Sequence, residues 1–328
     1  MGGRVLAAIV PVPHNEGMDE PRAFLNGRWI PGWAAAIPVG DAGFVLGATV
    51  AEQLRTFAGK LFRLEDHLAR LQQSLAIVGV DPGMTVDRLA AVAQELAARN
   101  HRLLAPGDDL GLSILVTPGA YRAYGPSGPA SPTVCLHTYP LPFYLWAEKY
   151  GRGEALVNSD VEQVSPRSWP PGLKCRSRMH YYLADRRAAG RDPGARALLL
   201  DRQGFVTETS TANVLVFRSA EGLISPPAEK ILRGISLAVL VELARELGIP
   251  TVYRDLTPPE VASADEVLLT STPVCLLPVT RLDGRPIGDG RPGEVFRRLL
   301  AAWSGLVGLD IAGQAKSFAG RDLTDPQT

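Results

Sequence analysis

One lysine, Lys174, stands in surroundings that suit covalent chemistry. A lysine amine attacks carbonyl carbons and can hold a carbonyl compound as a Schiff base. Most lysines instead lie exposed in solvent. Leu173 and Cys175 flank this lysine, and the preceding segment, residues 165–172, carries three prolines. Because prolines restrict the backbone, we interpret this segment as a positioned loop, and Lys174 directly follows it.

A second segment offers a site for an anion. Residues 236–247 show the apolar spacing of a helix, with Ser236 as the predicted N-cap and Gly248 as the stop. Residues 234–236 (Gly-Ile-Ser) would open this helix. The free N–H groups of a helix N-terminus bind phosphate, and glycine allows a close approach to the backbone. The start of this helix therefore offers groups that an anion could use.

The composition narrows the class of protein. The chain has 328 residues and a mass of 35.1 kDa. Lys plus Arg and Asp plus Glu both number 34, and the resulting zero net charge argues against a broad nucleic-acid or membrane surface. No apolar run approaches the roughly 18 residues of a membrane span. The three cysteines form no CxxC pair and the five histidines never stand at i, i+4, so we expect no metal site. Because the cysteines also show no disulfide framework, we expect a reducing, cytoplasmic location.

The elements that must position these residues form a repeated pattern. A hairpin signal at Asn26-Gly27 precedes a helical stripe that runs from Leu64 to Val78, and a second helix is predicted over 85–99. Further along, strands again accompany helices, which are predicted over 176–189, 236–247 and 293–303. Hairpins followed by helices, twice over, favour an α+β fold of two domains with mixed or antiparallel sheets.

Composition shifts suggest where these domains begin and end. We expect a loose leader over 1–21, a small N-terminal domain over 22–139, a linker over 140–153, a larger C-terminal domain over 154–308 and a tail over 309–328.

Several separated segments, in their order and spacing, resemble one known family. They are residues 62–71 (FRLEDHLARL), 172–178 (GLKCRSR), 199–213 (LLDRQGFVTETSTAN), 231–236 (ILRGIS) and 269–272 (LTST). Over about residues 22–305 the chain resembles the class IV aminotransferases, which are pyridoxal-phosphate enzymes of fold type IV. These include branched-chain and D-amino-acid aminotransferases, (R)-amine transaminases and aminodeoxychorismate lyases.

The resemblance implies pyridoxal 5'-phosphate as the cofactor, bound in the larger domain, with Lys174 as the lysine that holds it. Glu208 would lie beside the pyridine nitrogen, where a carboxylate favours the protonated ring. By the same resemblance, the other cofactor-binding residues would be Arg70, Ile235, Ser236 and Thr272.

The substrate side departs from the family pattern. Ala51 stands where an aromatic pocket residue is common, which implies a wider pocket. Met179 stands where branched-chain members carry a tyrosine. Ser113 lies on a predicted strand that lacks the arginine several members use for the substrate carboxylate. The candidate replacements are Arg178, Arg122, Arg176 and Arg167, of which Arg178 resembles the lyase branch slightly more.

The resemblance implies an aminotransferase that moves an amino group from an amino acid or amine to a 2-oxo acid by a ping-pong mechanism, with Lys174 as the general base. An aminodeoxychorismate lyase, which uses the same lysine but releases pyruvate, is one alternative. A non-catalytic protein on the same fold is another. The family also implies a homodimer in which a loop of one subunit reaches the active site of the other.

Overall fold

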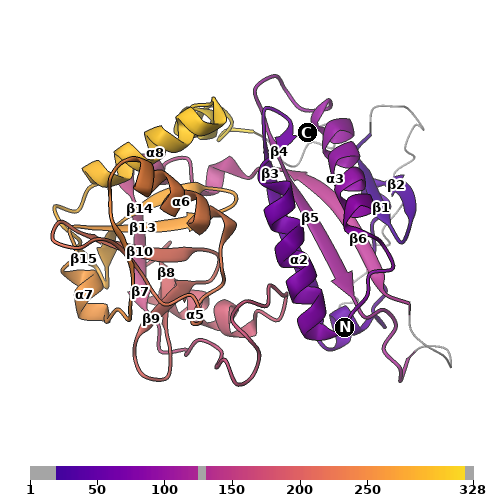
Figure 1. Ribbon diagram of the computed structural model, residues 1–328, viewed down its shortest axis with the longest axis horizontal. Helices are drawn as coiled ribbons and strands as arrows, with labels where there is room; N and C mark the ends of the chain where they lie inside the picture. The colour runs from indigo at the N-terminus through magenta and orange to yellow at the C-terminus, as the bar shows by residue number, and fades with distance from the viewer. Residues whose placement is uncertain (1–19, 125–130, 322–328) are drawn as a thin grey trace, which may run out of the picture.

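The computed structural model describes residues 20–124 and 131–321, which form two sheets that lie side by side (Figure 1). The first sheet is antiparallel, in the order β2-β1-β6-β5-β3-β4. Its strands are β1 (Arg22–Leu25), β2 (Arg28–Pro31), β3 (Val50–Phe57), β4 (Lys60–Leu61), β5 (Leu110–Thr117) and β6 (Thr133–Pro140). Except for its last two residues, the expected leader lies outside the described residues.

Two helices, α2 (Leu64–Val78) and α3 (Val86–His101), cover one face of this sheet (Figure 1). The predicted stripe on α2 is buried from Leu64 to Leu75 and packs against alternate strand residues such as Leu112 and Ile114. Val78 is 39% exposed, because the chain turns away from the sheet at Gly79 in the left-handed conformation. A 3-10 helix (Gly32–Ala34) and a short helix α1 (Ala42–Val45) complete this part of the chain.

The second sheet is mixed, in the order β12-β11-β10-β13-β14-β7-β8-β9, with β15 on β14. Its pairs β7–β8, β7–β14 and β11–β12 are parallel. Its strands are β7 (Glu154–Asn158), β8 (Arg196–Leu200), β9 (Val206–Thr209), β10 (Asn213–Arg218), β11 (Gly222–Ser225), β12 (Thr251–Tyr253), β13 (Glu266–Ser271), β14 (Cys275–Leu282) and β15 (Arg285–Pro286). Together with the helices, the two sheets confirm the predicted α+β fold.

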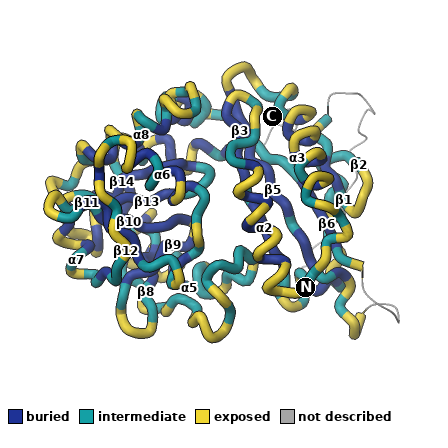
Figure 2. Tube along the Cα trace, in the orientation of Figure 1, coloured by how far each residue is buried: buried dark blue, intermediate teal, exposed yellow. Residues whose placement is uncertain are grey.

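Helices cover both faces of the second sheet. On β8, Ala197 and Leu199 face α5 (Met179–Arg191), whereas Leu198 faces the large core that contains α6 (Ile235–Glu246) and α8 (Glu294–Val307). This alternation follows from the two-residue period of a strand. A short helix α7 (Pro258–Ala262) lies between β12 and β13. Figure 2 shows buried residues along the strands of both sheets and exposed residues on the outer sides of the helices.

The chain that joins the two sheets is packed rather than extended. The predicted linker, residues 140–153, contains a 3-10 helix (Phe143–Leu145) and the short helix α4 (Lys149–Arg152). Phe143, Trp146 and Tyr150 are buried in the core of the second sheet. The Tyr150 hydroxyl donates to the Val274 carbonyl at 2.8 Å. This segment therefore anchors one sheet to the other.

Residues 309–321, the described part of the expected tail, also belong to this packing. Helix α9 (Ile311–Ser317) buries Gln314, whose oxygen accepts from Arg55 on β3 at 3.0 Å. The amide nitrogen of Gln314 donates to Asp109 at 2.8 Å. Arg55 also donates to the Pro273 carbonyl at 2.8 Å. The buried Gln314 of α9 thus links the last described helix to Arg55 and Asp109 of the first half of the chain.

Two local predictions were wrong. The helix predicted over 176–189 begins at Met179, because the backbone before it pairs with β3, where Cys175 forms a bridge with Val50. Ser236 is not the N-cap of α6, since Gly234 occupies the N-cap and Ile235 is the first helical residue.

In the described part of the chain, no helix is long and apolar enough to cross a membrane. The domain boundaries themselves stay a prediction.

Candidate active site

A cavity of about 510 Å³ lies where the two sheets meet. The first sheet and its helix contribute Gln53, Arg70 and Tyr139. The second half of the chain contributes the loop around Lys174, the ends of β9 and β13, and the start of α6. The cavity is large enough for a cofactor and a small substrate.

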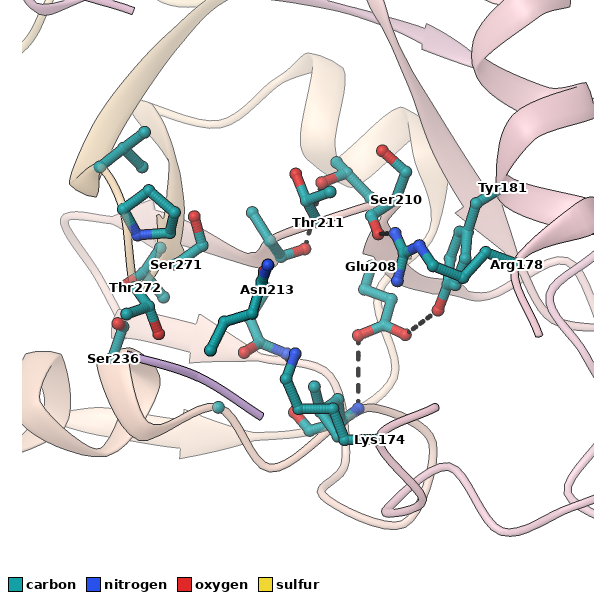
Figure 3. A pocket seen from close by; sticks show the side chains of 18 of the residues that line it. Lys174, Arg178, Tyr181, Glu208, Ser210, Thr211, Asn213, Ser236, Ser271 and Thr272 are labelled. Atoms are coloured by element: carbon teal, nitrogen blue, oxygen red, sulfur yellow. Dashed lines mark hydrogen bonds between the residues drawn. The ribbon is translucent and has the colours of Figure 1, made fainter. Parts of the chain in front are cut away.

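The loop that carries Lys174 is held by the first sheet. The Lys174 carbonyl accepts from the Ala51 N–H at 3.0 Å, and its own N–H donates to the Ser74 hydroxyl at 3.2 Å. The Arg176 N–H donates to the Thr49 carbonyl at 2.9 Å. These bonds fix the backbone, and the side chain lines the cavity (Figure 3). Although it follows the second sheet's first strand, this loop is anchored to β3 and α2.

The environment of Lys174 favours the neutral amine. Burial lowers the pKa of Lys174 to about 8, and the charge of Arg70 acts in the same direction. Glu52 opposes this shift, while Arg178 and Arg176 add to it. At pH 8 about half of the amines would be neutral, whereas less than about 1% of an ordinary lysine is neutral there. The neutral amine is the nucleophilic and basic form.

A second buried group, Glu208, lies on β9 with its carboxylate inside the cavity (Figure 3). The carboxylate accepts from the Tyr181 hydroxyl at 2.5 Å, from the Gln163 amide at 2.8 Å and from the Leu232 N–H at 3.3 Å. Burial raises the pKa of Glu208, while the Tyr181 and Leu232 hydrogen bonds act to lower it. Three donors around one buried carboxylate stabilise its anionic form and its orientation.

Arg70 belongs to an ion network that the sequence analysis missed. Its Nε and Nη2 atoms donate to the Glu52 carboxylate, each at 3.0 Å, and Nη1 donates to the Arg233 carbonyl at 2.9 Å. His67 Nδ1 lies 2.5 Å from the same carboxylate. Burial acts to raise the pKa of Glu52, but Arg70 and then His67 outweigh it and bring it to about 2. A glutamate, Glu52, on the buried strand β3 is the signal that could have revealed this network.

The other end of the cavity has the character of a phosphate site. Ile235 and Ser236 begin α6, and Thr272 follows β13; all three line the cavity. The first N–H groups of a helix have no partner within it. A Cβ on Gly234 would come within 2.1 Å of the Asn213 amide oxygen, so only glycine fits at this N-cap. In Figure 3, Ser236 and Thr272 lie on the side of the cavity opposite Tyr181 and Arg178.

The predicted substrate residues are only partly brought together. Arg178 lines the cavity, whereas Arg122, Arg176 and Arg167 do not. Ala51 is buried and reaches Lys174 through its backbone, without lining the cavity.

Ser113 is fully buried on β5 and lies outside the cavity lining. The ring of Tyr139 crosses β5 at Gly111 and itself lines the cavity. Among the described residues, the Ser113 hydroxyl has no hydrogen-bond partner.

Pyridoxal 5'-phosphate fits this donor set. A guanidinium and a glycine-capped helix start suit the phosphate, a lysine amine suits the aldehyde, and a buried carboxylate suits the ring nitrogen. Arg70 uses three of its five N–H groups for protein acceptors, which leaves two for a phosphate. Fold and cavity together therefore suit a class of enzyme that uses a phosphorylated carbonyl cofactor, with a lysine amine beside it.

Comparison with known families identifies the chain. The profile described as amino-transferase class IV matches residues 49–282, well over half of the sequence. The chain belongs to the class IV aminotransferase family, and it is a pyridoxal-phosphate-dependent aminotransferase that acts on amino acids and 2-oxo acids. The resemblance inferred from the sequence motifs is therefore confirmed.

Two curated relatives cover most of the chain. A D-alanine aminotransferase of Bacillus licheniformis is 30% identical over 284 residues, which is 86% of this chain and 95% of the relative. A putative branched-chain-amino-acid aminotransferase of Methanocaldococcus jannaschii is 29% identical over 282 residues, 85% of this chain and 93% of the relative.

Solved structures of branched-chain amino acid aminotransferases share the fold. The Escherichia coli enzyme superimposes with a TM-score of 0.80 at 24% identity, covering 88% of this chain and 95% of its own. A second such enzyme, described with pyridoxamine 5'-phosphate, gives a TM-score of 0.79 at 25% identity with the same coverage. The fold type IV prediction is confirmed.

The lowered pKa of Lys174 predicts how its reactivity depends on pH. In the cofactor-free enzyme, acylation of Lys174 by acetic anhydride should rise about tenfold per pH unit and level off above about pH 8, because the neutral fraction saturates there. Mass spectrometry of the peptide that contains Lys174 measures the rate. Nα-acetyl-lysine amide, with an ordinary pKa of about 10.4, is the reference amine. A midpoint for Lys174 equal to that of the reference would contradict the assigned environment.

Proposed function

We propose that Lys174 is the residue that binds pyridoxal 5'-phosphate and moves the proton in a ping-pong transfer of an amino group from an amino acid to a 2-oxo acid. The observation that carries this proposal is the half-buried Lys174, whose amine has a pKa of about 8, in a cavity that also holds Glu208 and the start of α6. When bound, the cofactor supplies an aldehyde that condenses with amines and a ring that withdraws electrons.

Each end of the cavity has its own task in this proposal. Arg70, Ile235, Ser236 and Thr272 bind the phosphate. Glu208 keeps the ring nitrogen protonated, because a buried carboxylate beside a basic nitrogen favours the charged form. Tyr181 and Gln163 orient that carboxylate by donating to the same oxygen. If the phosphate and the ring nitrogen of the cofactor are both held in this way, its reacting carbon would lie near Lys174.

Lys174 acts as the general base and then as the general acid. A base works best when its pKa is close to the operating pH, and a pKa of about 8 meets that condition far better than an ordinary lysine. The backbone bonds to Ala51 and Ser74 keep the residue in place while its side chain moves the proton. The cavity lies between the two sheets, so residues from both parts of the chain surround the place where the proton moves.

The acceptor side of the proposal separates the aminotransferase from the lyase. An aminotransferase needs a 2-oxo acid for each completed cycle, whereas a lyase would release pyruvate from aminodeoxychorismate without one. The curated relatives described above are both named as aminotransferases. D-Alanine and leucine are therefore the first donors to test. A cytoplasmic location stays a prediction.

Replacement of Lys174 by alanine tests the proposed function directly. The variant should retain the cofactor poorly and lose transamination of D-alanine or leucine, because no amine is left to hold the aldehyde or move the proton. Borohydride reduction followed by peptide mapping should label residue 174 in the wild type only. The control is Lys316→Ala, at an exposed position on α9. A Lys174→Ala enzyme with wild-type turnover would refute the proposal.

Substitution of Glu208 by glutamine tests the role of the ring-nitrogen partner. A neutral amide no longer favours the protonated ring, so kcat should fall by about 100-fold or more, the size typical of a lost electrostatic stabiliser in an active site. Steady-state kinetics at saturating donor and acceptor give kcat. Glu229→Gln, at an exposed position, serves as the control. An unchanged kcat in Glu208→Gln would remove this role.

We also propose a homodimer, supported by exposed apolar side chains on two neighbouring segments beside the lysine loop. Phe44 is 72% exposed and Met179 is 69% exposed. The Ser177 hydroxyl donates to the Gly47 carbonyl at 2.8 Å, which brings their two segments together. Clustered exposed apolar side chains mark interaction surfaces.

Light scattering should therefore give a mass of about twice 35.1 kDa for the purified enzyme. The doubly substituted variant Phe44→Asp, Met179→Glu should shift the mass toward that of one chain, because buried carboxylates weaken an apolar contact. Glu229→Gln is again the matched surface control. A monomeric wild type at micromolar concentration would contradict the proposal.

A further inference from the structure

Two arginines in the cavity have no carboxylate partner among the described residues. Arg178 donates through Nη2 to the Ser210 carbonyl, and Arg196 donates through Nη2 to the Thr211 hydroxyl. Both arginines line the cavity. Within the ranges 20–124 and 131–321, neither guanidinium has a carboxylate oxygen within 4.0 Å. Because Ser210 and Thr211 are adjacent, the two cations are anchored to the same stretch of cavity wall.

The acidic residues around Arg196 are engaged elsewhere. Glu154 and Asp185 are the carboxylates whose charges act on Arg196. Glu154 accepts from Lys149 Nζ at 2.8 Å, and Asp185 accepts from the Ala197 N–H at 3.0 Å. Among the described residues, neither carboxylate forms an ion pair with Arg196, although the charge of each still acts on it.

The two cations are close enough to repel each other. Burial lowers the pKa of Arg196, Glu154 and Asp185 act to raise it, and the charge of Arg178 lowers it further. Arg178 also acts to lower the pKa of Lys174 and of Glu208. The charge of Arg178 therefore acts on both proposed reactive groups of the cavity. Two neighbouring cations without a carboxylate in direct contact, in a partly desolvated site, are stabilised when an anion binds between them.

Local contacts hold the guanidinium of Arg178 in a fixed direction. Its centre lies 4.6 Å from the ring centroid of Tyr181, in a cation–π contact, while its Nη2 reaches Ser210. Arg196 begins β8 and, by strand alternation, points to the same sheet face as Leu198. Each guanidinium keeps further N–H groups free of protein acceptors, since each uses one nitrogen for its described hydrogen bond.

We propose that Arg178 and Arg196 together bind a carboxylate of the substrate between them. The inference rests on the proposed function, because it places the substrate beside Lys174 and Glu208. Planar guanidinium groups match the geometry of a carboxylate, and one shared anion relieves the repulsion of the pair. The site therefore takes amino acids and 2-oxo acids, and it disfavours amines that lack a carboxylate.

Binding of an unreactive acid to the holoenzyme tests this pair apart from turnover. The probes are pentanoate and its neutral analogue pentanamide, titrated by calorimetry. Wild-type enzyme should bind pentanoate at least about tenfold more tightly than pentanamide, since charge-assisted hydrogen bonds are lost with the amide. Arg196→Gln and Arg178→Gln should each raise the Kd of pentanoate by about tenfold and leave that of pentanamide unchanged.

Matched variants separate charge recognition from loss of structure. Arg196→Lys should recover part of the affinity, because it restores the charge without the planar fork. Arg202→Gln, at an exposed position just after β8, should bind pentanoate as the wild type does. Equal Kd values for pentanoate in Arg196→Gln and wild type would overturn the proposal, as would equal affinity of the wild type for acid and amide.

Borohydride labelling of residue 174 in each variant distinguishes this failure from a failure of the proposed function. If wild-type enzyme is not labelled, the proposed role of Lys174 fails. If residue 174 is labelled but Arg196→Gln binds pentanoate with the wild-type Kd, only the proposed carboxylate site is overturned.

Discussion

Lowering the pKa of a lysine amine where two sheets meet is the constraint on which the active site depends. Lys174 is close in sequence to the second sheet, but its backbone is bonded to Ala51 and Ser74 of the first. Burial and the nearby cations then lower its pKa to about 8. If the two sheets separated, water would reach the amine and that shift would vanish. The reactivity of Lys174 therefore depends on the packing of the two sheets against each other.

Charge balance around the cavity explains how so many cations can lie together. Glu52 neutralises Arg70 through two hydrogen bonds and lies close to His67. Without Glu52, the cations at this end of the cavity would repel one another and a doubly charged phosphate would be their only counterion. With it, Arg70 is held in one orientation before the phosphate arrives. Such preorganisation reduces the reorganisation that binding requires.

The junction is held by buried polar contacts as well as by apolar packing. Gln314 connects Arg55 to Asp109, and Arg55 reaches the Pro273 carbonyl in the turn that carries Thr272. The last helix of the chain thereby supports a wall of the cavity that it does not line. Buried polar groups that lose a partner are costly, so such networks define one arrangement of the sheets.

Much of the architecture was predictable because it depends on local patterns. The stripe of α2 and the pairing of hairpins with helices follow from the spacing of apolar residues, which is why the α+β fold was found. The start of α5 was missed, because residues before Met179 pair with a strand more than a hundred positions away. The role of residues 309–317 was missed too, since a short helix without a long stripe shows no sign of what it packs against.

The sequence by itself determined which residues could react: a lysine in a proline-rich loop, a glutamate after a turn, an arginine on a helix and a glycine before another helix. Only the tertiary structure decided their electrostatic state and their partners. Glu52 joins Arg70, Tyr181 joins Glu208, and Arg196 comes beside Arg178. The physical reason is that burial and charge interactions depend on distances between segments far apart in the chain, and residue types alone do not specify those distances.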